Sequence, residues 1–403
     1  MPFYSLPSLA KVLCTTSGLE KYEVESLTRS AFQVLTKKFY PPRKSRKPKL
    51  RYNLGEYMWE AACLASETID NAIEHIVGVG EKILVRKPVN LGRHIELFDP
   101  TYYSRLKKFV QFGEDLSCHR CSIKVGRRGD RGHVCRKPKN LIRRLVTETA
   151  NAKGKDWMGR KATTVHVGQR RIERAHGDAH FGNFLIDASV PEKPVVFLID
   201  TKHVNIQKKI FPLLFKDVNN DPLYDFAKLM LSCAVGYDLA YMEGVRPRSL
   251  GRRRTGNLWA VSLEFKGREQ LQKLGDVGGV TDAQIVRLAA RVSEDAVQNY
   301  RYANKVIREL TAAWLQDELR PNVRSVAAAQ VTMWLFAIRH AFSIAQHLFP
   351  KYPERSFAML VLAMRFLETG FDAAMAVIAS CGRDPSAVAQ LGGCFELLAC
   401  GHA

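Results

Sequence analysis

The segment "AHGDAHFGNFLID" (residues 175–187) places a histidine, an aspartate and an asparagine at fixed offsets before an apolar run. A second apolar run, "VVFLI", follows after a short gap and ends at Asp200. The stretch "ASVPEKP" between the two runs is rich in turn-forming residues, so the pattern predicts a β-hairpin over 184–200. In such a hairpin the end of the second strand returns to the start of the first.

The polar residues at this end of the hairpin suit phosphoryl transfer. Asp178, on a loop before the first strand, can accept a hydrogen bond from a substrate hydroxyl and orient it for attack. Asn183 and Asp200 offer an amide oxygen and a carboxylate, which are ligands that Mg²⁺ prefers and shares with phosphate. Catalysis of phosphoryl transfer is mostly positioning and charge neutralisation. His176 belongs to the same candidate catalytic loop, and we interpret it as a scaffold residue rather than a base.

The spacing H-x-D-x-x-x-x-N, followed by an aspartate at a strand end, resembles that of kinases. The version "HGDAHFGN", with "DPLYDFAKL" further on, is similar to the aminoglycoside phosphotransferase and choline-kinase-like branch. The resemblance covers residues 174–229. It implies that Asp178 is the catalytic base and that Asn183 and Asp200 bind Mg²⁺. It also implies that Asp225, at the start of a helix, is a structural acid that holds the catalytic loop.

A kinase-like fold also needs a lysine on a strand for the nucleotide phosphates and a helix glutamate that holds this lysine. The order of "QVLTKKFYPP" and "EYMWEAACLA" fits this need. Lys38 or Lys37 is then the phosphate-binding lysine, and because neighbouring strand residues face opposite sides, only one of them can point inward. Glu60, or less readily Glu56, is its partner. The alternative is that both lysines belong to a basic surface run.

The chain carries a formal net charge of +21 over its 403 residues. The basic residues gather in "RKSRKPKLR" (43–51) and between residues 120 and 174, a field that attracts anions. This charge favours a neutral or anionic acceptor, such as a sugar, over a cationic one. It leaves open an alternative in which a catalytically inert kinase-like fold binds nucleic acid or other anions through the 120–174 segment, with an affinity that falls with salt.

Nine scattered cysteines do not resemble a disulfide scaffold, and reduced thiols are the simpler interpretation. One group has partial zinc-site spacing, in which a C-x₂-C pair precedes an H-x-C pair. Its members are Cys118, Cys121, His133 and Cys135. The alternative is a basic loop with incidental thiols.

We therefore expect an α+β, two-lobe protein-kinase-like fold, with a small mixed β-sheet in the N-lobe and a mainly helical C-lobe. The expected domains are a nucleotide-binding lobe (1–90), a catalytic core with a basic insertion at 115–170 (91–245), and a helical region (246–403). Within the first lobe we expect strands over 30–42 and 81–89 and a helix over 53–76. We expect long helices in 323–349 and 355–370.

The expected enzyme transfers the γ-phosphate of ATP or GTP, with Mg²⁺, to a hydroxyl of a small molecule. No stretch has the roughly 18 uncharged apolar residues of a spanning helix, so we expect no membrane span. A cytoplasmic location is the default for such a sequence.

Overall fold

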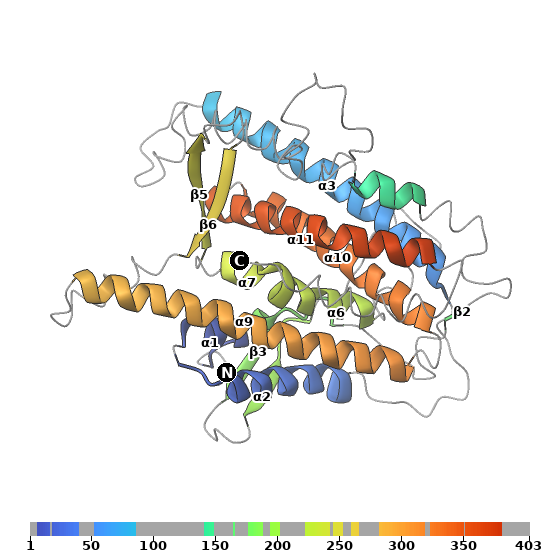
Figure 1. The fold of residues 1–403 in the computed structure, drawn as a ribbon, viewed down its shortest axis with the longest axis horizontal. Coiled ribbons are helices and arrows are strands. Elements are labelled where there is room, and N and C mark those ends of the chain that lie inside the picture. The colour runs from blue at the N-terminus through green and yellow to red at the C-terminus, as the bar shows by residue number, and fades with distance from the viewer. Residues whose placement is uncertain are drawn as a thin grey trace.

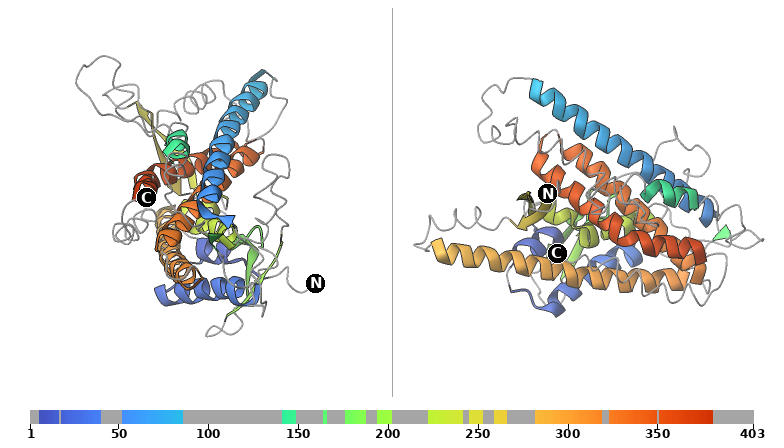
Figure 2. Two further views of the ribbon diagram at one scale, coloured as in Figure 1. Left: turned by 90° about the vertical axis from the view of Figure 1, so that its right-hand side faces the viewer. Right: turned by 45° about the horizontal axis from the view of Figure 1, so that its top comes forward.

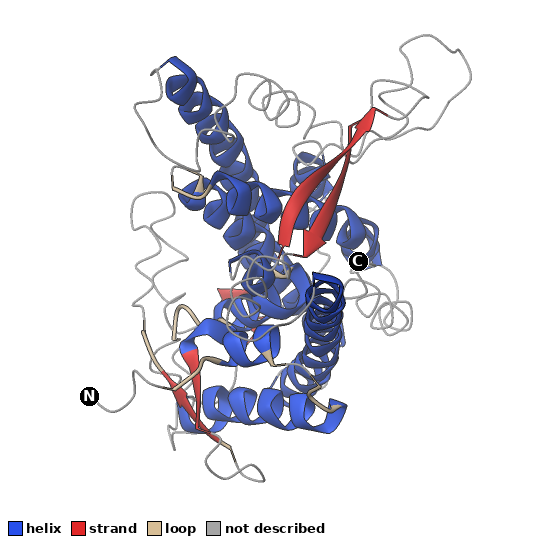
Figure 3. Cartoon of the chain, turned by 90° about the vertical axis from the view of Figure 1, so that its left-hand side faces the viewer, coloured by secondary structure: helices blue, strands red, loops and turns tan. Residues whose placement is uncertain are grey.

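The computed structural model describes most of the helical elements and the candidate catalytic loop. The described residues are 6–16, 18–39, 52–85, 141–148, 164–165, 176–187, 194–201, 222–241, 245–252, 259–265, 282–318, 323–349 and 351–380. They are mostly helical and include three two-stranded antiparallel sheets (Figures 1 and 3). This composition is compatible with the expected α+β class.

The N-terminal helices are α1 (Leu9–Thr15), α2 (Lys21–Gln33) with its π-helical continuation η2 (Val34–Phe39), and α3 (Leu54–Val85). Around the middle of the chain lie η5 (Phe181–Asn183), α6 (Pro222–Met230), η7 (Leu231–Val235) and α7 (Tyr237–Tyr241). The long C-terminal helices are α9 (Asp282–Glu318), α10 (Val323–Leu348) and α11 (Pro353–Ser380). The last two confirm the helices expected in 323–349 and 355–370.

The strands form three separate pairs. They are β1 (Tyr52–Asn53) with β2 (Thr164–Val165), β3 (Phe184–Asp187) with β4 (Val195–Leu198), and β5 (Val245–Arg252) with β6 (Trp259–Phe265). Figure 3 shows β3–β4 and β5–β6 at opposite sides of the helical body.

Helix α10 is the centre of the core, because it packs against α3, α11 and α6. Its middle residues 331–338 are all buried, as expected for a helix surrounded by protein. Trp334, Phe336 and Phe342 are among the largest fully buried side chains. On the other side of α6, helix α9 packs along α1 and α2 (Figures 1 and 2).

The predicted hairpin over 184–200 is confirmed. Strands β3 and β4 pair in antiparallel register, with Phe184 opposite Leu198 and Asp187 opposite Val195. The start of the chain extends the pairing on the other edge of β3, where Ser8 forms a bridge with Leu185. The Ile186 N–H also donates to the Pro7 carbonyl at 2.9 Å. The hairpin is therefore held between the rest of the fold and the N-terminal segment.

The strand expected over 30–42 is wrong within the described residues, because 30–39 are helical. The buried residues Leu27, Ala31 and Leu35 recur every four positions, which is the period of a helix face rather than a strand. The β-branched residues and the Pro-Pro that follows suggested a strand. Packing decided otherwise, since Phe32 stacks on Phe226 of α6 with ring centroids 5.5 Å apart.

Two further expectations need correction. The helix expected over 53–76 is confirmed but extends to Val85, so the first half of the strand expected over 81–89 is helical. Consequently, the described part of residues 1–90 contains helices and a two-residue strand, and not the expected small sheet. The hairpin β5–β6 lies in a region expected to be mainly helical, although "WAVSLEF" alternates apolar and other residues in the manner of a strand.

Within the described residues, every helix is too short or too polar to cross a bilayer.

Phe226 tests the helical packing of 30–39. This ring is fully buried, stacks on Phe32 and meets Trp314 of α9 edge-on at 5.0 Å. Phe226→Ala should lower the free energy of unfolding by about 3–5 kcal/mol in urea denaturation, because a cavity is left between three helices. Tyr22→Ala, at a ring that is 70% exposed, should change it by less than about 0.5 kcal/mol. Equal effects of the two substitutions would contradict this packing.

Candidate active site around Asp178

Two glycines allow the backbone conformation of the loop before β3. Gly177 adopts a left-handed conformation with φ of 82°, which a residue with a Cβ adopts only at a cost. At Gly182 an added Cβ would lie 2.7 and 2.8 Å from atoms of the His180 ring. This space lets His180 Nδ1 accept the Gly182 N–H at 3.1 Å. The loop therefore closes on itself just before the strand begins.

The carboxylate of Asp225 anchors the start of this loop. Its two oxygens accept the N–H groups of His176 at 2.6 Å and Gly177 at 2.7 Å, and the side chain is fully buried. Hydrogen bonds to an ionised acceptor are shorter and stronger than neutral ones. Asp225 also lies in the first turn of α6, where the helix dipole favours a negative charge. This geometry agrees with the structural role that the resemblance implies.

His176 connects the loop to the end of strand β4. Its Nδ1 accepts the Asp178 N–H at 3.3 Å, and its Nε2 lies 2.8 Å from the Ile199 carbonyl oxygen. Since Nδ1 accepts, the proton of a neutral ring is on Nε2, which then donates to Ile199. Both ring nitrogens of this buried residue are thus engaged, in accordance with a scaffold role.

A second anchor holds the far end of the loop. The Phe181 N–H donates to Ser232 Oγ at 2.9 Å. Ser232 hydrogen-bonds Asp238, which also accepts the Tyr300 hydroxyl at 3.2 Å. Cys14 of α1 donates to that hydroxyl at 3.6 Å. Through this network η7, α7, α9 and α1 all restrain the loop.

Asp238 is buried, and burial raises its pKa to about 7, although the hydrogen bonds from Ser232 and Tyr300 oppose the shift. Burial also raises the pKa of Cys14 to about 12, so its thiol stays protonated and able to donate. The Cys14 proton of the network therefore stays in place at neutral pH, whereas Asp238 titrates near this pH.

Asp178 lies between two nitrogen atoms in a nearly closed environment. Lys228 Nζ is 3.0 Å from Oδ1, and His180 Nε2 is 3.8 Å from Oδ2. Sequence reasoning missed Lys228. The signal was present, because Lys228 follows Asp225 by three positions on α6, and residues at that spacing share a helix face.

Further cationic and aromatic groups lie behind Lys228. Arg339 of α10 donates to the Tyr224 hydroxyl at 3.5 Å, and the Tyr224 ring meets His340 edge-on at 4.6 Å. Burial, then the charges of Lys228 and Arg339, hold the pKa of His340 well below its usual range. His340 is consequently neutral, and the charge on this side of the site comes from the lysine and the arginine.

Asn183 is oriented by its own loop. Its Nδ2 donates to the Asp178 carbonyl at 2.7 Å, which directs the side-chain oxygen, the atom that binds metals, away from that carbonyl. Its backbone carbonyl accepts the Ile199 N–H at 2.9 Å. Asp200 follows Ile199 directly, so the hairpin brings it to the same end of the sheet as Asn183.

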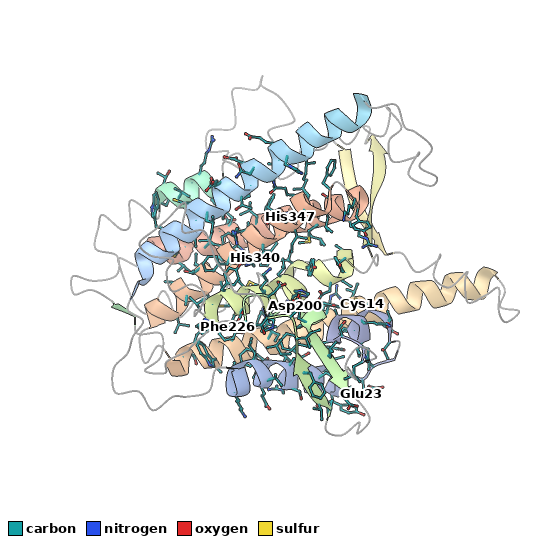
Figure 4. The ribbon with its side chains drawn as sticks, turned by 180° about the vertical axis from the view of Figure 1, so that it is seen from behind. Cys14, Glu23, Asp200, Phe226, His340 and His347 are labelled. Atoms are coloured by element: carbon teal, nitrogen blue, oxygen red, sulfur yellow. The ribbon has the colours of Figure 1, made fainter. Side chains whose placement is uncertain are left out.

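Asp200 is exposed and is the one described non-glycine residue with a positive φ, 54°. Figure 4 shows it at the end of the β3–β4 hairpin that faces the helices. One carboxylate and one amide oxygen fit Mg²⁺, which takes one or two carboxylates and completes its shell with water and phosphate. The described residues contain no group of three or more His, Cys, Asp or Glu side chains placed to hold a metal ion.

The structure does not reproduce the expected strand context of the phosphate lysine. Lys37 and Lys38 lie in η2, and Glu60 and Glu56 lie in α3. Lys37 is exposed, while the side chains of the other three lie outside the described part, so the pairing stays a prediction.

Other predictions fall beyond the described residues. The four candidate zinc ligands (Cys118, Cys121, His133 and Cys135) lie there, as does most of the basic 120–174 segment. The zinc site and the nucleic-acid alternative therefore stay predictions.

Comparison of the chain with protein-family models, curated proteins and solved structures gave no match.

Removal of the Asp225 charge should release the start of the loop. Asp225→Asn replaces one acceptor with an NH₂ group that opposes a backbone N–H, so we expect the free energy of unfolding to fall by about 2–4 kcal/mol. The amides of residues 176 and 177 should also lose protection in hydrogen exchange. Asp295→Asn is the matched control, because Asp295 accepts the Gly18 N–H at an exposed site. If both substitutions leave exchange at 176 and 177 unchanged, Asp225 does not hold the loop.

Asp238 should make stability depend on pH. Its pKa rises from 3.8 in an unfolded chain to about 7, so between these values the folded state binds more protons. Stability therefore falls as pH rises from about 4 to 7, by about 1.4 kcal/mol per pH unit, and is then constant with respect to this group. Urea denaturation of the wild type minus that of Asp238→Asn should isolate this slope. Parallel pH profiles of the two proteins would contradict it.

Proposed function

We propose that this chain is a kinase-like phosphotransferase, which moves the γ-phosphate of ATP or GTP to a hydroxyl of a small, non-cationic acceptor. One observation carries the proposal: Asp178 lies on a loop fixed at both ends, directly before a hairpin that brings Asn183 and Asp200 to the same edge. The spacing of these residues, with Asp225 on the following helix, resembles the aminoglycoside phosphotransferase and choline-kinase-like branch, and the two-lobe fold of that branch is part of the proposal.

In the proposed reaction the acceptor oxygen attacks the γ-phosphorus in line. A new O–P bond forms, the bond to the β-phosphate oxygen breaks, and the nucleoside diphosphate leaves with that electron pair. Asp178 orients the acceptor hydroxyl and takes its proton. Mg²⁺ held by Asn183 and Asp200 would supply positive charge to the phosphate oxygens.

The neighbours of Asp178 support this role. Lys228 Nζ lies 3.0 Å from Oδ1, so this ion pair fixes the side chain of Asp178. Oδ2 then faces His180 and is the oxygen that the acceptor hydroxyl meets. In this arrangement Lys228 is a positioning residue that acts through Asp178.

The backbone of Asp200 is a second support. A positive φ in a residue other than glycine is sparsely populated and costs on the order of 1 kcal/mol or more. Such conformations persist where the surroundings enforce them, and they gather at ligand-binding sites. The strain at Asp200 fits a carboxylate that is aimed at a ligand.

Charge narrows the acceptor class. The chain is strongly basic, and the cations of Lys228 and Arg339 lie close behind Asp178. A cationic acceptor such as an aminoglycoside would meet like charge there, whereas a sugar or another neutral or anionic compound would not. We therefore propose a sugar-like acceptor.

The decisive experiment compares wild type, Asp178→Asn and Asp200→Asn in Mg²⁺-dependent ATP and GTP binding and in turnover on neutral sugars, acidic sugars and an aminoglycoside. Asp178→Asn should bind Mg-nucleotide normally and lose about 10²-fold or more in turnover, because it removes the base. Asp200→Asn should lose Mg²⁺-dependent nucleotide binding. Asp295→Asn, remote from the loop in sequence and only partly buried, should match wild type in both assays.

Product mass completes the test. A gain of one phosphate agrees with the proposal, whereas a gain of a nucleotide indicates a different reaction. If Asp200→Asn binds Mg-nucleotide as tightly as wild type, the metal assignment is wrong.

A further inference from the structure

A row of side chains leads from Asp178 to the surface of the molecule. It consists of His180 on the loop, Tyr237 and Tyr241 on α7, and Tyr352 and Arg355 at the start of α11; we call it the aromatic row. His180 contacts Tyr237, Tyr237 contacts Tyr241, and Arg355 contacts both Tyr241 and Tyr352. The row begins at the carboxylate of Asp178, the proposed base. A molecule bound along the row would therefore lie close to this carboxylate.

The contacts along the row are short. His180 Nε2 lies 3.8 Å from Asp178 Oδ2, and the His180 ring meets Tyr237 edge-on with centroids 5.3 Å apart. The Tyr237 and Tyr241 rings are 5.5 Å apart. The Arg355 guanidinium then lies over both outer rings, 5.8 Å from the Tyr241 centroid and 4.5 Å from that of Tyr352.

Exposure increases along the row. The side chain of Asp178 is 8% exposed and that of His180 is 17% exposed. Tyr237 is partly buried, and Tyr241 and Tyr352 are each 45% exposed. Packing explains the inner members, and Tyr237 and Tyr241 share a face of α7 at a spacing of four residues. It does not explain why two large rings with a cation between them remain open to solvent beside the site.

The exposed rings stand on a fixed backbone. The Tyr352 N–H donates to the Leu348 carbonyl at 2.7 Å, and the Tyr352 carbonyl accepts the Ser356 N–H at 2.9 Å. Ser356 Oγ in turn donates to the Ala345 carbonyl of α10 at 2.6 Å. Rings held in this way lose little conformational entropy when they bind a ligand, which is the property of a preorganised binding surface.

The chemistry of the row suits a sugar ring. Aromatic faces carry partial negative charge and attract the partly positive C–H groups on one face of a pyranose. The tyrosine hydroxyls and the His180 ring can hydrogen-bond to sugar hydroxyls. Burial, with the charges of Asp238, Tyr241 and Asp178, raises the pKa of Tyr237, so this hydroxyl stays protonated as a donor. The guanidinium of Arg355 disfavours a cationic ligand at the same place.

We infer that the aromatic row is part of the acceptor subsite: one pyranose ring of the acceptor stacks on Tyr241 and Tyr352, and the rest of the acceptor follows Tyr237 and His180 toward Asp178. This inference rests on the proposed function for the reaction itself. The binding of the sugar can be measured without turnover.

The test uses the full chain and measures binding by saturation-transfer NMR and calorimetry. The probes are glucose, N-acetylglucosamine, glucuronic acid and their methyl glycosides, with choline as the cationic comparator. Tyr241→Ala and Tyr352→Ala should each weaken binding of the preferred sugar by about tenfold, because each removes one stacking face. Tyr241→Phe should keep most of the affinity, since it keeps the face. Tyr22→Ala, at an exposed tyrosine of α2, should bind as wild type.

Asp178→Asn separates this inference from the proposed function. If sugar binding survives Asp178→Asn but is lost in Tyr241→Ala, the subsite is supported. If the same protein transfers no phosphate, the proposed phosphotransferase is overturned. Phosphorylation of a sugar with unchanged KM in Tyr241→Ala and Tyr352→Ala overturns the subsite and leaves the enzyme. If no sugar binds, or if choline binds instead, the row is a packing contact or a cation site and the inference fails.

Discussion

The rest of the site depends on the hydrogen bonds that the buried carboxylate of Asp225 accepts from the loop. A carboxylate removed from water must find hydrogen-bond donors, and here two consecutive backbone N–H groups of the loop supply them. These bonds are possible because Gly177 takes a left-handed conformation. The first turn of α6 therefore fixes the position and direction of a loop that is distant in sequence.

The second anchor makes the loop rigid rather than merely attached. Phe181 is held by Ser232, and Ser232 by Asp238, so both ends of a short segment are tied to the segment that contains α6, η7 and α7. The hairpin follows without a break, and His176 joins its far strand to the loop. The positions of Asp178, Asn183 and Asp200 thus follow from a few backbone contacts. Their separation in sequence is bridged by strand pairing and not by flexible side chains.

Where sequence reasoning succeeded, the signal was local and the pattern had one physical solution. Two apolar runs with a turn between them can bury themselves as a hairpin, and the long apolar runs near the C-terminus are too long for strands. It failed at residues 30–39, where β-branched residues and the Pro-Pro that follows favoured a strand. Phe32 stacks on Phe226, and this contact favours a helix over residues 30–39. That partner lies far along the chain, so no local pattern reveals it. Lys228 was missed although its spacing from Asp225 on α6 places both on one helix face, because that spacing does not indicate that Asp178 is its partner.

The sequence by itself determined the order of the candidate groups: a histidine and an aspartate on a loop, an asparagine, a second aspartate at a strand end and an aspartate at a helix start. It also determined the hairpin and the long helices, because hydrophobic periodicity is a property of neighbouring residues. Only the tertiary structure decided that the N-terminal segment joins the hairpin edge, and that Lys228 and His180 face the two oxygens of Asp178. The row of rings from His180 to Tyr352 is likewise a product of folding. Its members come from the loop, α7 and the start of α11, and contacts between distant segments depend on how surfaces pack, which sequence order does not encode.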